Sequence, residues 1–194
     1  MTKTIIVEGI DHIGKTTWIK KCLIPGLRSM YGPSYDIVYY RDLVQLNTIK
    51  QVLPNETADF LDKKHYGILC GIINMLEAFK DRKIVFVFDR LHLSGAAYAR
   101  GLRNNDDPYK FNTWFETELK RVTDPLLVSC LLDENQIPSD DDEVVNSKQL
   151  KQINSIFAEY TLLTTLPKYT IFLKMDNGIS NLTEKMTVPP EFLK

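Results

Sequence analysis

The stretch KTIIVEGIDHIGKTTWIKK, residues 3–21, decides the fold of this chain. An apolar run rich in β-branched residues is followed by a segment with two glycines and then by a pattern of helical periodicity. The central GIDHIGKT, residues 9–16, matches GxxxxGK(S/T), in which glycines let backbone N–H groups point at phosphate oxygens. The N-terminus of the following helix adds partial positive charge. The stretch therefore predicts a strand, a phosphate-binding loop and a helix, in that order.

The residue types in this loop suit a nucleoside triphosphate bound together with Mg²⁺. We expect Lys15 to reach the terminal phosphates, and the hydroxyl of Thr16 to ligate the Mg²⁺ ion that bridges them. ATP and Mg²⁺ are therefore the expected cofactors. The residues expected to contact ATP are Gly9, His12, Ile13, Gly14, Lys15, Thr16 and Thr17.

Outside the loop, short apolar runs alternate with longer stretches of helical periodicity. The expected strands are 4–7, 36–40, 84–88, 126–132 and 169–173, and the expected helices are 15–23, 57–80, 93–103, 109–122 and 148–163. Because parallel neighbours need crossover connections, this order predicts an α/β fold with a five-stranded, mainly parallel sheet and helices on both faces. The run VFVF at 85–88 is apolar on both faces, which is typical of a central strand.

Length and charge narrow the class of protein. The chain has 194 residues, of which 24 are Lys or Arg and 25 are Asp or Glu, so its net charge is -1. This balance argues against stable binding to nucleic acid or to an acidic membrane surface, because both require an excess of cations. No apolar run approaches the roughly 20 residues of a membrane span, and because the strand pattern begins within the first residues we expect no signal peptide. We therefore expect one cytoplasmic domain with no membrane partner.

Cysteines and histidines give no metal signature. Cys22, Cys70 and Cys130 are far apart in apolar stretches, without a CxxC pair, and are expected to be buried and reduced. The three histidines also lack the spacing of metal ligands. We expect no zinc site.

A phosphate-binding loop alone does not distinguish a motor, a GTPase, a synthetase and a small-molecule kinase. GTPases read guanine with an NKxD signature, which is absent, and a motor ATPase ordinarily needs a larger core than 194 residues provide. A small kinase is the best fit to the remaining features.

Three blocks of sequence resemble the thymidylate kinases, in the order in which that family carries them. EGIDHIGKTT at 8–17 is similar to the family's EGxDxxGKTT opening, and DRLHLSGAAY at 89–98 is similar to its DRYxxSGxAF segment. YRD at 40–42 stands where the family has Arg-Glu-Pro. The resemblance extends loosely through residues 1–175 and implies a single-domain P-loop kinase whose substrates are nucleotides.

The resemblance also implies features outside the catalytic core. We expect a kinase domain over 1–175, with a lid at about 133–147 and an irregular tail at 176–194. The short lid and compact size resemble phage-encoded members of the family. A homodimer is expected by resemblance, and the apolar helix face that would form it comprises Ile68, Ile72 and Met75, which in a monomer would simply be core.

The acceptor site is expected where the strands end. In an open parallel sheet, ligands collect beyond the carboxyl ends of the strands, where the phosphate loop, Arg41, Asp89 and Arg90 all lie. Arg41 and Arg90 are the natural clamps for an acceptor phosphate, because guanidinium forks suit phosphate oxygens. Asp89 is expected near Mg²⁺ or the acceptor. The alternatives are surface ion pairs for both arginines and a helix N-cap for Asp89.

Two loop residues are assigned through the resemblance. Asp11 would repel ATP, so we expect it to point to the acceptor sugar, and the resemblance implies contact near the 3′-hydroxyl. His12 stands where some family members carry a catalytic arginine, and either donates to a phosphate or faces solvent. The expected catalytic residues are Lys15, Arg90, Asp89 and Asp11.

Base recognition requires an apolar slot with an aromatic wall. Tyr66 and His65 on the long helix are candidates, as is Tyr98 after Ser94, although Tyr66 could instead serve ordinary helix packing. The arginine with which the family reads the thymine edge has no counterpart here, although Asn74 could replace it. The base preference therefore stays open. The expected substrate-binding residues are Asp11, Arg41, Tyr66, Arg90, Ser94 and Tyr98.

The expected lid departs from the family's arginine-bearing segment. Residues 133–146 contain no Arg or Lys and carry four consecutive acids at 140–143, which are typical of a solvated face. Some cation is expected to stabilise the equatorial oxygens of the transferred phosphoryl group. The cations that could supply this charge are Lys148, Lys151, Arg100 and Arg103.

These features predict a kinase that makes a diphosphate from a deoxynucleoside monophosphate, dTMP or a related one. The nearest alternative is a deoxynucleoside kinase, in which Asp42 or Asp89 would take the proton of a 5′-hydroxyl. Two further alternatives are a kinase of a hydroxymethyl base in DNA and a module that binds ATP without turnover. The lid without cations favours the last of these.

Overall fold

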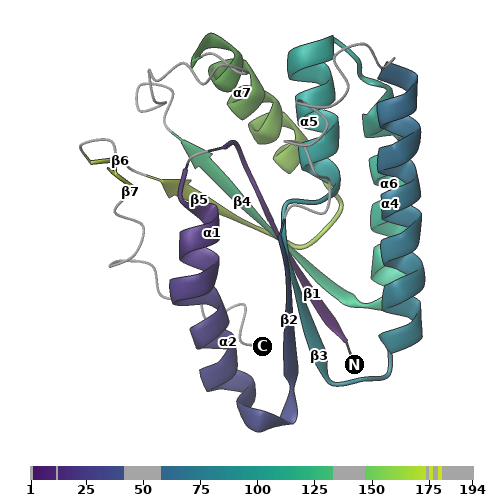
Figure 1. The fold of residues 1–194 in the computed structure, drawn as a ribbon, viewed down its shortest axis with the longest axis vertical. Helices are drawn as coiled ribbons and strands as arrows, with labels where there is room; N and C mark the ends of the chain where they lie inside the picture. The colour runs from purple at the N-terminus through teal and green to yellow at the C-terminus, as the bar shows by residue number, and fades with distance from the viewer. Residues whose placement is uncertain are drawn as a thin grey trace.

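The sheet is parallel throughout. The computed structural model describes residues 2–11, 13–41, 58–132, 147–173, 175–176 and 179–180. The strands are β1 Lys3–Glu8, β2 Asp36–Arg41, β3 Ile84–Asp89, β4 Asp124–Leu132 and β5 Lys168–Leu173. They form one five-stranded sheet in the order β2-β3-β1-β4-β5, with every neighbouring pair parallel (Figure 1). The predicted α/β fold is confirmed.

Helices cover the sheet from both sides. After the loop the chain forms α1 Lys15–Trp18, a π-helical turn at Ile19–Leu23, α2 Ile24–Tyr31 and a 3₁₀ turn at Gly32–Ser34. The later helices are α4 Ala58–Phe79, α5 His92–Arg103, α6 Asp107–Val122 and α7 Ser147–Leu163. In Figure 1, α1 and α2 lie on one side of the sheet, and α4 and α6 lie on the other.

The first helical run is longer than the periodicity predicts. It continues beyond residue 23 to Tyr31, although Pro25 and Gly26 follow directly. Pro25 lies in the first turn of α2, immediately after the π-helical turn. A proline lacks the N–H that would bond four residues back, and a π turn is one of the local adjustments that let a helix pass such a position. The proline therefore changes the hydrogen bonding of the run without ending it.

Strand register brings the predicted site residues together at the carboxyl ends of the strands. Asp89 at the end of β3 pairs with Arg41 on one side and with Val7 of β1 on the other. Glu8, the last residue of β1, pairs with Ser129 of β4. The segment that begins at Gly9 therefore leaves the sheet beside Asp89 and Arg41.

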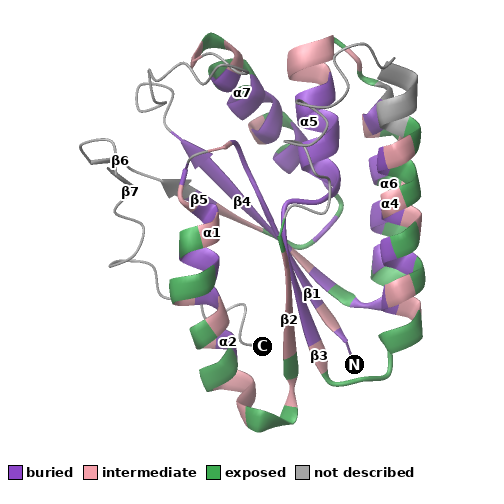
Figure 2. Ribbon diagram, viewed as in Figure 1, coloured by how far each residue is buried: buried purple, intermediate pink, exposed green. Residues whose placement is uncertain are grey.

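The interior strands and α5 are the most deeply buried elements around the carboxyl ends of the strands (Figure 2). Every residue of β3 after Ile84 is buried, as expected for an interior strand, whereas β2 at the sheet edge is only partly covered. The first eight residues of α5, His92 to Ala99, are all buried. The residues that follow β3 are thus held on a rigid part of the molecule.

Several expectations fall on other parts of the chain. His12, Asp42, the lid at 133–146 and the tail from 181 lie outside the described residues. Met175–Asp176 and Ile179–Ser180 form a two-stranded antiparallel sheet, β6 and β7. Cys130 is buried, whereas Cys22 and Cys70 are half-buried, and all three are free thiols.

Two searches of the described residues were negative. No helix among them is long and apolar enough to cross a membrane. Nor do three or more His, Cys, Asp or Glu side chains in these ranges gather into a group that could hold a metal ion.

Candidate functional site

The phosphate loop depends on two glycines with left-handed backbone. Gly9 has a φ of 143° and Gly14 a φ of 81°, values that other residues rarely adopt. A Cβ atom on Gly9 would lie 2.3 Å from the carbonyl oxygen of Cys130 on β4. The chain can therefore turn away from the sheet here only without a side chain. Gly14 is the N-cap of α1, so the N-terminus of that helix faces the loop.

Lys15 is folded into the loop. Its side chain is buried, and its Nζ donates to the carbonyl oxygen of Ile10. Burial, together with the charge of Arg90, lowers the pKa of Lys15 to about 8, although Asp11 opposes the shift. A buried ammonium group beside a helix N-terminus is suited to an anionic ligand, because both carry positive charge.

Asp89 connects the loop helix with β2. Its Oδ2 atom accepts hydrogen bonds from the hydroxyl of Thr16 and, at 3.0 Å, from the hydroxyl of Tyr39. The N-cap of α5 is Leu91, so Asp89 does not cap that helix. Burial and the Asp89 carboxylate both raise the pKa of Tyr39. A carboxylate and a hydroxyl in contact, beside the phosphate loop, form a pair of oxygen donors of the kind that Mg²⁺ prefers.

Asp11 and Arg90 form an ion pair in the same place. The Arg90 guanidinium contacts Asp11 Oδ1, while the hydroxyl of Tyr98 donates to Asp11 Oδ2 at 2.7 Å and accepts from the Asp11 N–H at 3.1 Å. Burial opposes ionisation of Asp11, but the Arg90 guanidinium holds the pKa of this carboxyl well below its usual range. Tyr98, itself buried on α5, thus fixes the orientation of Asp11.

The backbone at Arg90 is strained. Arg90 has a φ of 75°, in the left-handed region that non-glycine residues occupy at a cost in free energy. Its N–H donates to the carbonyl oxygen of Val7 at 2.9 Å, so the end of β1 holds the turn between β3 and α5. This conformation directs the guanidinium toward the loop rather than away from it.

Arg41 is more exposed than the other site cations. It ends β2 directly beside Asp89 in the register, and no ion pair joins it to another described residue. Tyr39 lies two residues earlier on the same face of the strand. The charge of Arg41 lowers the pKa of Tyr39, but the larger effects of burial and Asp89 raise it. Tyr39 is a site residue that the sequence analysis did not identify, although its alternation with Arg41 was a usable signal.

Ser94 makes a structural contact. It is fully buried, and its hydroxyl donates to the carboxylate of Glu8 at the end of β1. Glu8 was also not identified from the sequence, although a charged residue at the end of an apolar strand is a signal of its own.

The two aromatic candidates on α4 point in different directions. The ring of Tyr66 packs on Phe111 and Trp114 of α6, at centroid distances of 4.8 and 5.2 Å, and is 37% exposed. His65 is buried, and its ring lies against Gly95, where an added Cβ would come within 2.2 Å of Cε1. Burial lowers the pKa of His65 to about 4, so this ring is neutral at pH 7. Of the two, only His65 lies against the helix that carries Ser94 and Tyr98.

Of the four cations that could stabilise the transferred phosphoryl group, Lys148 and Lys151 are exposed, and Arg100 and Arg103 are half-buried. Arg100 pairs with Asp106 at 3.2 Å and with Glu159 of α7 at 2.8 Å. Lys148 and Lys151 lie in the first turns of α7.

The predicted dimer face is partly occupied within the chain. Ile72 is buried in the core, and Ile68 and Met75 pack partly against the same core. Met75 also accepts a hydrogen bond at its sulfur from the hydroxyl of Tyr40, at 3.4 Å. The dimer stays a prediction from resemblance.

Solved structures share this architecture. A thymidylate kinase from Ehrlichia chaffeensis has a TM-score of 0.59 and 19% sequence identity, covering 88% of this chain and 90% of its own. This chain therefore shares the fold of that protein. The YorR protein of Bacillus subtilis, solved in complex with phosphorylated GDP, has a TM-score of 0.50 at 16% identity, with 87% of this chain and 85% of its own covered.

Other comparisons add less. A deoxyadenosine kinase from M.mycoides, solved with dCMP and dCDP, reaches a TM-score of 0.49 at 15% identity, over 87% of this chain and 89% of its own. No protein-family profile matches the chain, and no curated protein matches it in sequence. The likeness to the thymidylate kinase from Ehrlichia chaffeensis confirms the predicted fold.

The buried state of Lys15 predicts a pH dependence of stability. Its pKa is about 8 in the folded protein and near the ordinary 10.5 when unfolded, so between these values the unfolded state binds more protons. The free energy of unfolding should therefore rise with pH from 8 to 10.5, by up to about 3 kcal/mol relative to Lys15→Met. Urea unfolding of both proteins across this range measures the difference. If the unfolding free energies of the two proteins changed with pH in the same way, the pKa of Lys15 would be the same in the folded and unfolded states, which would contradict the prediction.

Proposed function

We propose that this protein transfers the γ-phosphoryl group of ATP, with Mg²⁺, to a deoxynucleoside monophosphate, dTMP or a related compound, giving ADP and the diphosphate. The observation that carries the proposal is the position of two arginines beside Asp89, the carboxylate proposed to bind Mg²⁺. Arg41 lies opposite Asp89 in the backbone register of β2 and β3, and Arg90 follows Asp89 in the chain. Two guanidinium groups beside a phosphate loop suit an acceptor that itself carries a phosphate.

The residues present fit a magnesium ion. Thr16 and Asp89 place a hydroxyl and a carboxylate oxygen in contact at the start of the loop helix, and Asp89 is 3% exposed. These two residues would hold Mg²⁺, because hydroxyl and carboxylate oxygens are the donors that this ion prefers. When bound, the ion neutralises charge on the phosphates.

The chain's own residues position the two substrates. The loop N–H groups and the α1 N-terminus bind the ATP phosphates, and Lys15 leaves the Ile10 carbonyl to contact them. An oxygen of the acceptor phosphate bonds to the γ-phosphorus as the bond from that phosphorus to the bridging oxygen of ADP breaks. This reaction needs little covalent chemistry from the protein, so positioning and charge neutralisation supply most of the catalysis.

Asp11 and Tyr98 support this arrangement from the acceptor side. Arg90 has five N–H donors and can keep its contact with Asp11 while it binds a phosphate. Asp11, oriented by Tyr98, would then also be available to accept a hydrogen bond from the acceptor sugar. Arg90 is thereby held in place before the acceptor binds, which reduces the entropic cost of ordering a long side chain.

A deoxynucleoside kinase is the second candidate, and the Asp11–Arg90 pair is the observation that favours it. This pair already neutralises one of the two cations, so the acceptor side is less positive than two isolated arginines would make it. A nucleoside acceptor would need a carboxylate as base. Asp89 accepts hydrogen bonds from Thr16 and Tyr39 and is poorly placed to take a proton from a third hydroxyl.

One assay separates the two candidates. The protein is incubated with ATP and Mg²⁺ against separate panels of deoxynucleosides, deoxynucleoside monophosphates and duplex DNA, and ADP release is measured. We expect release with one or more monophosphates only. Turnover of nucleosides but not monophosphates would contradict the proposal, and ATP binding without ADP release in any panel would favour an ATP-binding module.

Arg41 provides a residue-specific prediction. Arg41→Ala should raise the KM for the monophosphate at least tenfold and change the KM for ATP less than twofold, because only the acceptor phosphate loses a charge-assisted contact, worth about 1.5–3 kcal/mol. The matched control is Arg82→Ala, which lies in the exposed turn before β3, at the amino ends of the strands. This change should leave both KM values as in the unaltered protein. Steady-state kinetics with each substrate varied in turn tests this prediction. Equal increases in both constants would remove Arg41 from the acceptor site.

A further inference from the structure

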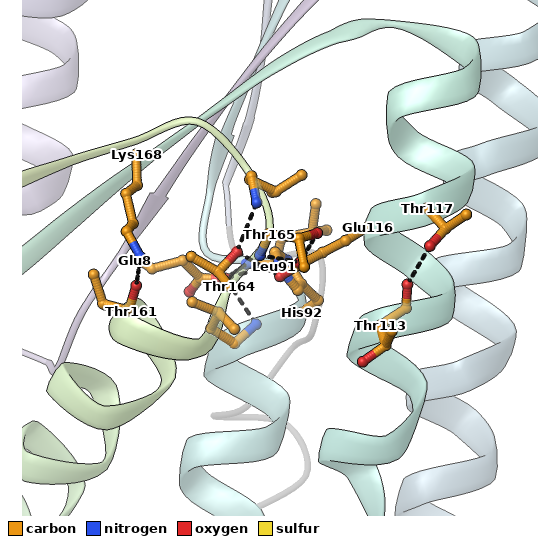
Figure 3. Close-up of polar contacts among 12 residues, drawn as sticks. Glu8, Leu91, His92, Thr113, Glu116, Thr117, Thr161, Thr164, Thr165 and Lys168 are labelled. Atoms are coloured by element: carbon orange, nitrogen blue, oxygen red, sulfur yellow. Dashed lines mark hydrogen bonds and ion pairs between the residues drawn. The ribbon is translucent and has the colours of Figure 1, made fainter.

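A cluster of buried ionisable side chains lies behind the site and has no part in the mechanism above. Glu8 of β1 and His92 of α5 are fully buried, and Glu116 of α6 is 3% exposed. Figure 3 shows them meeting beneath the start of α5, together with threonines from the turn between α7 and β5. A carboxylate without access to water is costly unless hydrogen-bond donors surround it.

Glu8 binds the first turn of α5. Its Oε1 atom accepts hydrogen bonds from the backbone N–H groups of Leu91, at 2.9 Å, and Leu93, at 3.1 Å, and its Oε2 atom accepts from the Ser94 hydroxyl. The helix has no N-cap side chain of its own, because Leu91 occupies that position. A carboxylate from a different strand thus satisfies N–H groups that a local cap normally binds, and its charge suits the helix N-terminus.

These contacts enclose Arg90 on both sides. The N–H of Arg90 donates to Val7, and the next N–H along the chain, that of Leu91, donates to Glu8. Two consecutive residues at the end of β1 therefore hold the left-handed turn at Arg90, whose φ is 75°. A conformation of this kind persists only where its surroundings hold it.

His92 and Glu116 complete the surroundings of Glu8. The Nδ1 atom of His92 lies 4.0 Å from Glu8 Oε1, and its Nε2 atom donates to Glu116 Oε1 at 3.2 Å. Burial opposes ionisation of Glu116, but the hydrogen bonds and charge of His92 lower the pKa of Glu116 to about 2. Glu116 also accepts from the Thr164 hydroxyl at 2.6 Å and from the Thr165 N–H at 2.8 Å. The imidazole is therefore fixed at the far side and presents its other nitrogen to Glu8.

We propose that Glu8 is a positioning residue for phosphoryl transfer, which fixes Arg90 toward the acceptor phosphate by capping α5 from the end of the phosphate-loop strand. This inference rests on the proposed function for its kinetic consequence, but not for its structural one. Glu8 does not touch either substrate in this account. It acts through the backbone of Leu91 and Leu93, and the buried His92 and Glu116 keep its carboxylate in place.

The test compares Glu8→Gln with a matched variant on the same strand, Thr4→Val. Thr4 is also fully buried, and its hydroxyl bonds to that of Thr123 at 3.0 Å, far from Arg90 at the other end of β1. The first readout is the NMR signal of the Arg90 guanidinium, assigned with Arg90→Lys and independent of activity. The second is the KM for the monophosphate against that for ATP.

The proposal expects Glu8→Gln to broaden or shift the Arg90 signal and to raise the KM for the monophosphate at least fivefold, with the KM for ATP changed less than twofold. Thr4→Val should leave both readouts as in the unaltered protein. An unchanged Arg90 signal in folded Glu8→Gln would overturn the inference, as would equal increases in both KM values. If Glu8→Gln does not fold, Glu8→Asp, which keeps the charge but shortens the reach, decides by the same criteria.

The two readouts separate this inference from the proposed function. If the unaltered protein turns over no monophosphate, the proposed function fails, and the NMR comparison still decides whether Glu8 holds Arg90. If the unaltered protein is an active kinase and Arg90 is indifferent to Glu8, only the present inference fails.

Discussion

The parallel pairing of β1 with β3 is the constraint on which the whole site depends. This pairing places Val7 beside Asp89, so that the loop after one strand and the turn after the other leave the sheet at the same point. Thr16 can then reach Asp89, and Asp11 can reach Arg90. Side chains alternate between the two faces of a strand, so a slip of one residue would turn Asp89 away from the loop helix. The buried apolar residues of both strands oppose such a slip, and the core thereby sets the geometry of the site.

Polar and ionisable side chains at the carboxyl ends of the strands already have partners within the protein before any ligand binds. Arg90 pairs with Asp11, while Lys15 lies buried close to both. Behind them, Glu8 and Glu116 enclose His92. The contact with Asp11 holds the Arg90 guanidinium in place beforehand, which lowers the cost of reorganisation when a polyanion binds. A net charge of -1 for the chain is therefore compatible with a small group of cations, Lys15, Arg41 and Arg90, at the carboxyl ends of the strands.

Much of the fold could be predicted from the sequence, because its signals are local. The glycines at 9 and 14 and the alternation of apolar runs with helical patterns define the strand, loop and helix order, and the right-handed crossover rule limits how such units assemble. The grouping of Asp89, Arg90 and Arg41 follows from the same logic, since parallel strands end at one edge. The direction of a helical side chain is less predictable. Tyr66 and His65 are neighbours in sequence, yet one packs outward on α6 and the other inward on α5.

Contacts between distant segments were beyond the reach of sequence patterns. Glu8, His92 and Glu116 lie in three different elements, and no spacing in the sequence relates them. Ser94 shows the same limit, because its hydroxyl could face a ligand or a buried carboxylate, and only the packing of α5 on β1 decides. Polar residues inside an apolar layer are nevertheless worth marking in a sequence, since burial obliges them to find partners.

The central claim is that one crevice holds ATP and a second phosphorylated molecule end to end. A bisubstrate compound, in which adenosine and a deoxynucleoside are joined through five phosphates, tests it most directly by isothermal titration calorimetry against adenosine tetraphosphate. The account predicts that the bisubstrate compound binds at least tenfold more tightly, and that Arg41→Ala removes the difference. Equal affinities for the two compounds would contradict the claim that Arg41 and Arg90 form an acceptor site beside the phosphate loop.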